Sequence, residues 1–159
     1  IYNEFGNKQG LLMAVLHQQI TLQTQTIASI NTTKLAHQEA LKEMCFRFVK
    51  GMVSDTLVSL FRLVIQVIPK LPEVGDLIYE KGPLKGMKPL TEYLMQLNDK
   101  KILAIDDPFY ATHMLIEMVK GRLHFKVILL PNNKITDAEI HQHVDTAVDL
   151  FLKAYRVEN

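Results

Sequence analysis

The sequence of 159 residues has no tryptophan, a single cysteine and almost no net charge. One cysteine, Cys45, excludes an internal disulfide and suits a reducing compartment, so we expect a cytoplasmic protein. The 18 basic and 17 acidic residues leave a net charge of +1, so overall charge gives no support for nucleic-acid binding. A chain of this length can still bury a core without a disulfide or a metal.

Long apolar runs are also missing. Residues 9–33 contain no Asp, Glu, Lys or Arg, but glutamines such as Gln18 and Gln19 interrupt them, and a bilayer span needs about 20 mostly apolar residues. We therefore expect no membrane segment. The sequence begins with Ile1 rather than methionine, so we expect it to be part of a longer chain.

Motifs for catalysis are absent from the sequence. It has neither a glycine-rich phosphate loop nor a nucleophile-elbow serine. Cys45 lies on the apolar stripe of an expected helix, which favours a core role over a catalytic thiol. His141 and His143 are two residues apart on a helix, so they face different directions and are poorly placed to share a metal. We expect no enzyme activity, no cofactor and no metal.

What the sequence does contain is a helical period. Apolar residues recur every three or four positions, and Ser54, Asp107 and Thr136 stand where N-caps belong, with Glu139 completing a capping box. Prolines break the pattern, and Pro89 is expected to kink its helix. Residues 127–130 are read as helix continuation or loop. The expected helices cover residues 7–29, 36–53, 54–68, 73–80, 83–97, 106 to at least 120, and 136–155.

The N-terminal residues carry a specific motif. An aliphatic residue, a tyrosine, a phenylalanine, a lysine and a leucine occupy fixed spacings at Ile1, Tyr2, Phe5, Lys8 and Leu11. This segment resembles the end of the DNA-binding domain in the TetR/AcrR family of bacterial transcription regulators. Most of that family's helix-turn-helix precedes this point and is absent from the sequence.

A second, more diffuse pattern covers the rest of the chain. It is similar to the effector-binding domain of regulators with an AefR-like C-terminal region, and its residues are Phe61-Arg62-Leu63-Val64-Ile65, Pro69, Pro72-Glu73, Tyr79, Gly82-Pro83 and Asp107-Pro108. The two resemblances imply an all-α fold, a helical effector-binding bundle of TetR type. Residues 1–6 would be the end of the helix-turn-helix domain, and residues 7–159 a ligand-binding and dimerisation domain.

The resemblance also implies sites. Tyr2 and Lys8 would contact DNA phosphates. The ligand pocket would use Met44, Phe48, Met52, Phe61, Arg62, Gln66, Met95, Phe109, His113, Met114 and Glu117. The last two long helices would pair with those of a second copy through Ile116, Val119, Leu123, Val144, Val148, Phe151 and Tyr155. For each pocket and interface residue, ordinary packing within one chain stays open as the alternative.

The function that the resemblance implies is a ligand-responsive transcriptional regulator, with a repressor as the leading interpretation. It would bind operator DNA as a homodimer and be released by a small, largely apolar effector. The alternative is a stand-alone helical ligand-binding or dimerisation module that does not bind DNA.

Overall fold

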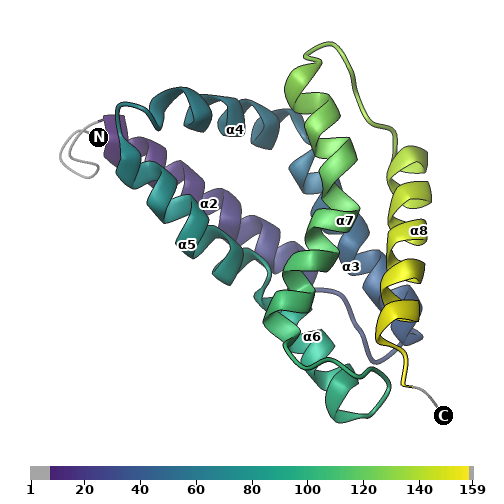
Figure 1. The fold of residues 1–159 in the computed structure, drawn as a ribbon. Coiled ribbons are helices and arrows are strands. Elements are labelled where there is room, and N and C mark those ends of the chain that lie inside the picture. Colours follow the sequence, from purple (N-terminus) through teal and green to yellow (C-terminus); the bar gives the residue numbers. More distant parts are fainter. Residues whose placement is uncertain (1–7, 158–159) are drawn as a thin grey trace.

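A computed structural model describes residues 8–157 of the protein (Figure 1). Over these residues the backbone forms helices and no strand, apart from an isolated antiparallel bridge between Leu103 and Arg156. The predicted all-α fold is confirmed. The helices are α2 (Lys8–Ala28), α3 (His37–Met52), α4 (Asp55–Val67), α5 (Pro72–Gly86), α6 (Lys88–Asp99), α7 (Pro108–Leu129) and α8 (Asp137–Tyr155). The expected helix-turn-helix remnant, residues 1–6, lies outside the described residues.

Three helices begin at the caps that the sequence predicts. The Ser54 hydroxyl accepts a hydrogen bond from the backbone amide of Leu57 at the start of α4, at 3.3 Å. Asp107 does the same for the third residue of α7, and Pro108 occupies the first turn, where its missing amide hydrogen costs nothing. Thr136 and Glu139 form the full capping box at the start of α8.

The boundary between α5 and α6 differs from the prediction. The sequence predicts a short helix over residues 73–80 and another over residues 83–97, whereas α5 runs through Gly82 to Gly86 and α6 starts at Lys88. Gly82 lies against Ile20 of α2, so packing between α2 and α5 outweighs the weak helix propensity of glycine. Pro89 stands in the first turn of α6, where it needs no hydrogen bond and causes no kink.

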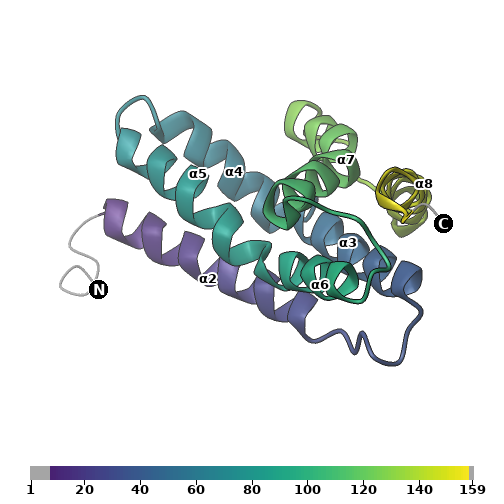
Figure 2. The same cartoon turned by 60° about the horizontal axis from the view of Figure 1, so that its bottom comes forward.

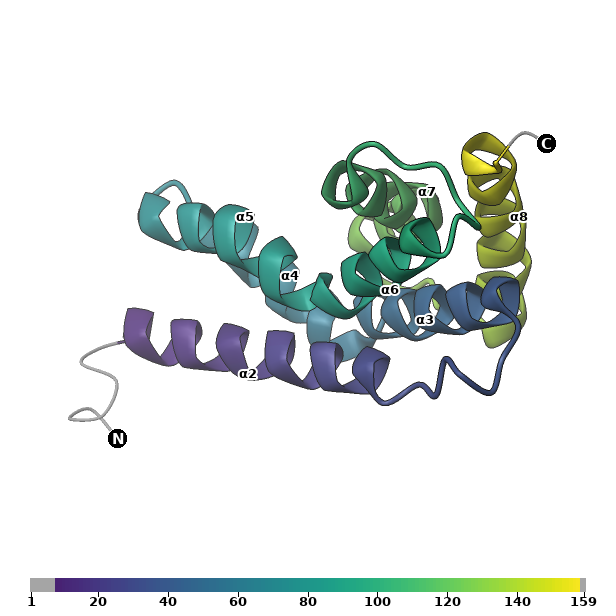
Figure 3. The same ribbon diagram turned by 90° about the horizontal axis from the view of Figure 1, so that it is seen from below.

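The helices form two groups that meet along α2. At one end α2, α4 and α5 pack around a small cluster centred on Leu16, Val64 and Val74. At the other end α3, α6, α7 and α8 enclose the main core, to which Leu41, Leu94 and other fully buried side chains belong. Views from two further directions show α2 extending past the main group beside α5 (Figure 2, Figure 3). The border between the two groups is where the site described below lies.

Helix α8 is held on α3 by polar contacts as well as by the core. Lys42 pairs with Asp149 at 2.9 Å, and Gln38 donates to the same carboxylate at 2.7 Å. These contacts hold the pKa of Asp149 below its usual range. No helix within residues 8–157 is both long enough and apolar enough to cross a bilayer.

Candidate ligand cavity

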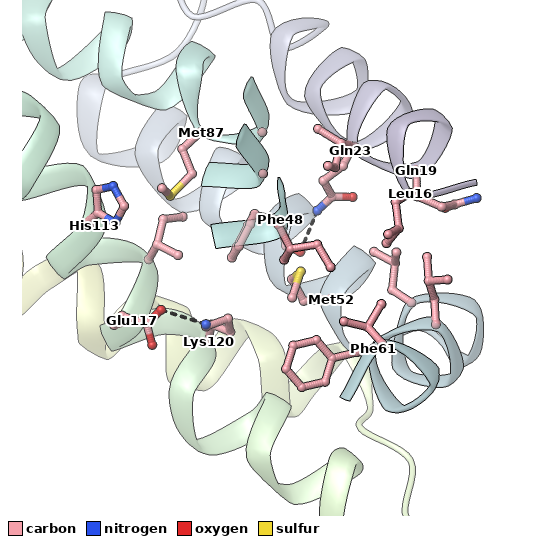
Figure 4. Close-up of a pocket in the computed structure, with 18 residues that line it drawn as sticks. Leu16, Gln19, Gln23, Phe48, Met52, Phe61, Met87, His113, Glu117 and Lys120 are labelled. Carbon is pink, nitrogen blue, oxygen red and sulfur yellow. Dashed lines mark hydrogen bonds and ion pairs between the residues drawn. The ribbon is translucent and has the colours of Figure 1, made fainter. Parts of the chain in front are cut away.

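A cavity of about 280 Å³ lies between the two groups of helices (Figure 4). Its walls come from α2, α3, α4, α5 and α7, together with Met87 between α5 and α6. This volume is close to the lower end of the roughly 300–1,000 Å³ typical of small-molecule sites. The cavity is lined by residues of both clusters, Leu16 and Val64 from the smaller one and Phe48 and Ile116 from the main core.

Most of the cavity wall is apolar. Phe48 and Met52 come from α3, Phe61 from α4 and Met87 from the α5–α6 junction. Aliphatic side chains complete the surface: Leu16, Ile20, Leu57, Leu60, Val64, Ile78 and Ile116. Flat rings and flexible thioethers can adjust to different apolar ligands, so this wall suits an adaptable site.

Polar side chains stand on two opposite walls. His113, Glu117 and Lys120 are four and three residues apart on α7, which puts them on one face of the helix. Gln19 and Gln23, four residues apart on α2, line the cavity on the other side. In Figure 4 the amide of Gln23 points towards Phe48, whereas the amide of Gln19 points away from Phe48 and Met52. The wall between these two polar edges is formed by apolar side chains, so polar groups lie at both ends of an apolar cavity.

On the α7 wall two charges neutralise each other. The Lys120 ammonium lies 2.7 Å from Oε1 of Glu117, and the side chain of Lys120 is only 21% exposed. His124, one turn further along α7, is buried with its ring edge against Phe61. Burial and, next, the positive charge of Lys120 lower the pKa of His124 to about 4, against a smaller opposing effect of Glu117. The imidazole of His124 is therefore neutral at pH 7.

His113 has an unsatisfied nitrogen. Its Nε2 is buried and has no hydrogen-bond partner among the described residues. The ring packs against the ring of Phe109 with 4.6 Å between centroids, in a T-shaped arrangement. A buried polar atom without a partner is costly, so this nitrogen is an unfavourable feature of the α7 wall.

On the α2 wall, Gln23 lines the cavity and also contacts α3, which crosses α2 at this point. Its Nε2 donates to the carbonyl oxygen of Phe48 at 2.8 Å, so α2 is fastened to α3 by an amide that also lines the cavity. The crossing is close at Gly51, where a Cβ atom would overlap the amide of Gln23. Because glycine has no Cβ atom, the Gln23 amide can occupy this space.

The other cysteine and histidine residues considered in the sequence analysis are buried or contact neighbouring residues. Cys45 is fully buried in the main core, and burial raises the pKa of its thiol to about 12. His141 stacks on Phe46, while Nε2 of His143 lies 3.0 Å from the carbonyl oxygen of Met118. Within residues 8–157 no group of three or more His, Cys, Asp or Glu side chains is arranged to hold a metal ion. The cavity is thus the best-formed candidate site of the described chain.

Comparison with known proteins assigns the chain to a family. The family model for the C-terminal domain of AefR-like transcriptional repressors matches residues 39–157. The chain belongs to the TetR family of transcriptional regulators. No curated protein matches it.

Solved structures of TetR-family regulators share this fold. One described as a TetR-family regulator from Mesorhizobium loti MAFF303099 is 23% identical with a TM-score of 0.87, over 98% of this chain and 79% of that one. The flavonoid-responsive regulator FrrA is 22% identical with a TM-score of 0.82, over 99% and 80%. A TetR regulator from Agrobacterium tumefaciens is 22% identical with a TM-score of 0.74, over 99% and 76%. At these identities the likeness shows a common fold.

In this TetR-family chain, five of the predicted pocket residues line the cavity together: Phe48, Met52, Phe61, His113 and Glu117. The other six lie elsewhere. Met44 is buried in the main core, and Arg62 donates from Nη2 to the carbonyl oxygen of Val127 at 2.6 Å, at the C-terminal end of α7. The remaining four are exposed, namely Gln66, Met95, Phe109 and Met114. Neighbours in a helix point about 100° apart, so a residue one position from a lining residue can miss the cavity.

The predicted interface residues of the TetR-family chain lie within its own core. Ile116, Val119, Leu123, Val144, Val148 and Phe151 are buried, and Tyr155 is half-buried beside Phe151. Six of these side chains are therefore covered by other residues of the same chain, and an interface role for them stays a prediction. The exposed face of α7 instead carries Tyr110, Met114, Phe125 and Leu129.

Sequence reasoning missed part of the cavity. The α5 wall, formed by Ile78, Gly82 and Gly86, lies in a segment whose glycines and proline were read as a break between helices. Gln19 and Gln23 of α2 also line the cavity, although neither was among the predicted pocket residues. Of the predicted DNA contacts, Lys8 is exposed at the start of α2, and Tyr2 lies outside the described residues.

Proposed function

We propose that this chain is the sensing part of a ligand-responsive transcriptional regulator. In this proposal it is a repressor that binds operator DNA as a homodimer and is released when a small, largely apolar effector enters the cavity. The single observation that carries the proposal is the cavity itself, which joins an apolar body to polar edges on α2 and α7. Membership of a family of regulators supports the same reading, and no catalytic role is assigned.

Helix α2 is the proposed link between ligand and DNA. It begins next to the N-terminal segment, where Tyr2 and Lys8 are the proposed phosphate contacts, and four of its side chains line the cavity. An effector can shift the regulator away from its DNA-binding arrangement only by its difference in affinity for the two arrangements. A ligand that displaces the amide of Gln23 would loosen the bond from α2 to α3 and so favour a different position of α2.

Homodimer formation is proposed through α7 and α8. Large apolar side chains are exposed on α7 at Tyr110, Met114, Phe125 and Leu129, and on α8 at Leu150. Large apolar side chains that are exposed on one helix face are typical of protein–protein contacts. A two-fold arrangement would let the same patch on each copy cover the other.

The test uses substitutions on α2 in the regulator as its gene encodes it. Gln19→Trp places a bulky ring at the cavity wall and should reduce the response to effector while leaving DNA affinity without effector unchanged. Gln18→Trp is the matched control, because Gln18 is exposed and does not line the cavity. Since the similarly folded FrrA is a flavonoid-responsive regulator, flavonoids belong in the first set of effectors screened. Equal loss of effector response and DNA affinity in Gln19→Trp would contradict the proposal.

The alternative function, a ligand-binding or dimerisation module that does not bind DNA, predicts a different result. Gln19→Trp would again reduce the response to effector, but neither the unaltered chain nor the variant would bind DNA.

A further inference from the structure

The ion pair on the α7 wall of the cavity is unevenly buried. The side chain of Lys120 is 21% exposed, whereas that of Glu117 is 65% exposed. Both residues line the cavity, and Glu117 is the sole ion-pair partner of the Lys120 ammonium among the described residues (Figure 4). The cation therefore belongs to the cavity wall, and the carboxylate that neutralises it is mostly in solvent.

An ion pair of this kind can exchange its carboxylate. Moving Glu117 fully into water costs little, because most of its side chain is already hydrated and exposed ion pairs contribute little to stability. The Lys120 ammonium would then lack its partner beside a mostly apolar wall, which is unfavourable. An anion that takes the position of the Glu117 carboxylate keeps the ammonium paired. The exchange replaces one carboxylate by another and buries no additional unpaired charge.

The charges around this ion pair favour an anion over a cation. Glu117 and Lys120 also border an open hollow on the outer surface of α7, together with Arg122. Among the residues that line the cavity and this hollow, Glu117 is the one carboxylate, whereas Lys120 and Arg122 are cations. His124 in the same hollow is neutral at pH 7 and adds no charge. Once Glu117 is displaced, this edge of the cavity is positively charged.

The remaining wall suits an apolar body. Phe48, Met52 and Phe61 supply rings and a thioether, and the Gln23 amide on the opposite wall already donates to the carbonyl oxygen of Phe48. The cavity volume of about 280 Å³ limits the body to a few rings. A ligand with one anionic end and an apolar ring system matches both parts of this wall.

Resting on the proposed function, we propose that the effector is an amphipathic organic anion, an apolar ring system with one carboxylate that replaces Glu117 as the partner of the Lys120 ammonium. The ring system lies among Phe48, Met52 and Phe61, and the carboxylate lies at the α7 edge of the cavity.

Two probes of the same shape test this assignment: 2-naphthoate and 2-naphthamide. They share the ring system and a planar substituent, and they differ in the charge of that substituent at pH 7. Equilibrium dialysis against the full chain measures both dissociation constants in the same way. The expected result is that 2-naphthoate binds about tenfold more tightly, as a charge-assisted hydrogen bond to a partly buried ammonium would give.

Substitutions in the ion pair should act in opposite directions. Lys120→Met removes the ammonium and keeps an apolar stem, so it should abolish the roughly tenfold advantage of 2-naphthoate. Glu117→Gln removes the competing carboxylate, so it should tighten the binding of 2-naphthoate about two- to fivefold. Both variants should bind 2-naphthamide within about twofold of the unaltered chain, which also reports that they are folded. An ion pair with a structural role alone would instead change the binding of both probes alike.

A second ion pair of the chain provides the matched control. Lys88 and Glu92 lie 3.7 Å apart on α6, both are exposed, and neither lines the cavity. Lys88→Met and Glu92→Gln make the same two chemical changes as the variants of the α7 pair. They should alter the affinity for neither probe.

The outcomes separate this inference from the proposed function. Equal binding of the two probes by the unaltered chain, or tighter binding of 2-naphthamide, would overturn the anion assignment and leave the apolar cavity in place. A full tenfold advantage of 2-naphthoate in Lys120→Met, or weaker binding of 2-naphthoate by Glu117→Gln, would overturn it as well. Failure of both probes to bind would contradict the ligand cavity itself and with it the proposed function.

Discussion

The crossing of α2 over α3 gives the sharpest quantitative prediction. At Gly51 a Cβ atom would overlap the amide of Gln23, which donates to the carbonyl oxygen of Phe48 at 2.8 Å. Gly51→Ala therefore has to displace that amide. Replacing a helical glycine by alanine stabilises by roughly 0.5–1 kcal/mol. Losing the Gln23 hydrogen bond costs about 1 kcal/mol. The two effects should nearly cancel, so Gly51→Ala alone should hardly change the free energy of unfolding.

Removing the Gln23 amide should make the stabilising effect of Gly51→Ala measurable. In a Gln23→Ala chain the Cβ atom at position 51 meets no obstacle there, and Gly51→Ala should then stabilise by the full 0.5–1 kcal/mol or so. The coupling between the two positions is therefore expected to be about 1 kcal/mol. Urea unfolding at 25 °C of the four proteins in this cycle measures it. Equal stabilisation by Gly51→Ala in both backgrounds would refute the contact between Gly51 and Gln23.

Three further predictions concern DNA contact, assembly and pH. In the protein as its gene encodes it, Lys8→Ala should weaken binding to all DNA sequences and reduce the salt slope by about one per half-site. Phe125→Glu should give monomers in light scattering, because it puts a carboxylate into the proposed apolar interface. The folded chain keeps His124 neutral, with its pKa lowered to about 4, whereas the unfolded chain protonates it near pH 6.5. Its contribution to stability is therefore complete above pH 6.5 and lost as the pH falls towards 4, by about 2 kcal/mol between pH 7 and pH 5 in urea unfolding.

Each of these predictions has a matched control. Lys34→Ala removes another exposed charge, between α2 and α3, and should leave the salt slope unchanged. Tyr79→Glu changes an exposed aromatic side chain on α5 and should leave assembly unchanged. His124→Leu should remove most of the stability loss between pH 7 and pH 5. An unaltered slope in Lys8→Ala, dimers in Phe125→Glu, or the full pH dependence in His124→Leu would each contradict its prediction.

Local chemistry made the helix starts predictable. Ser54, Asp107 and Thr136 accept hydrogen bonds from amides within their own first turn, so the sequence contains all the information that sets those boundaries. The α5–α6 boundary depends instead on packing between distant segments. Gly82 lies beside Ile20 of α2, and nothing in the sequence around residues 80–89 contains that contact.

The sequence predicted the kinds of side chain that line the candidate site better than it predicted which individual residues do so. Phe48, Met52 and Phe61 were expected because rings and thioethers are abundant in the middle helices, and they do line the cavity. Met44, on the same stripe of α3, is buried in the main core and does not line the cavity. A periodic pattern tells which face of a helix is covered, but the covering neighbour, whether core or cavity, depends on the three-dimensional arrangement.

The most direct test of the central claim is a selection of genomic DNA by the regulator as its gene encodes it, with and without an effector that binds the cavity. Our interpretation predicts that a short two-fold symmetric sequence is enriched, and that its occupancy falls as the effector is added. Gln19→Trp should enrich the same sequence and resist release by the effector. Recovery of no sequence above a control without protein, or occupancy that the bound effector leaves unchanged, would contradict the claim that this chain couples a ligand to DNA binding.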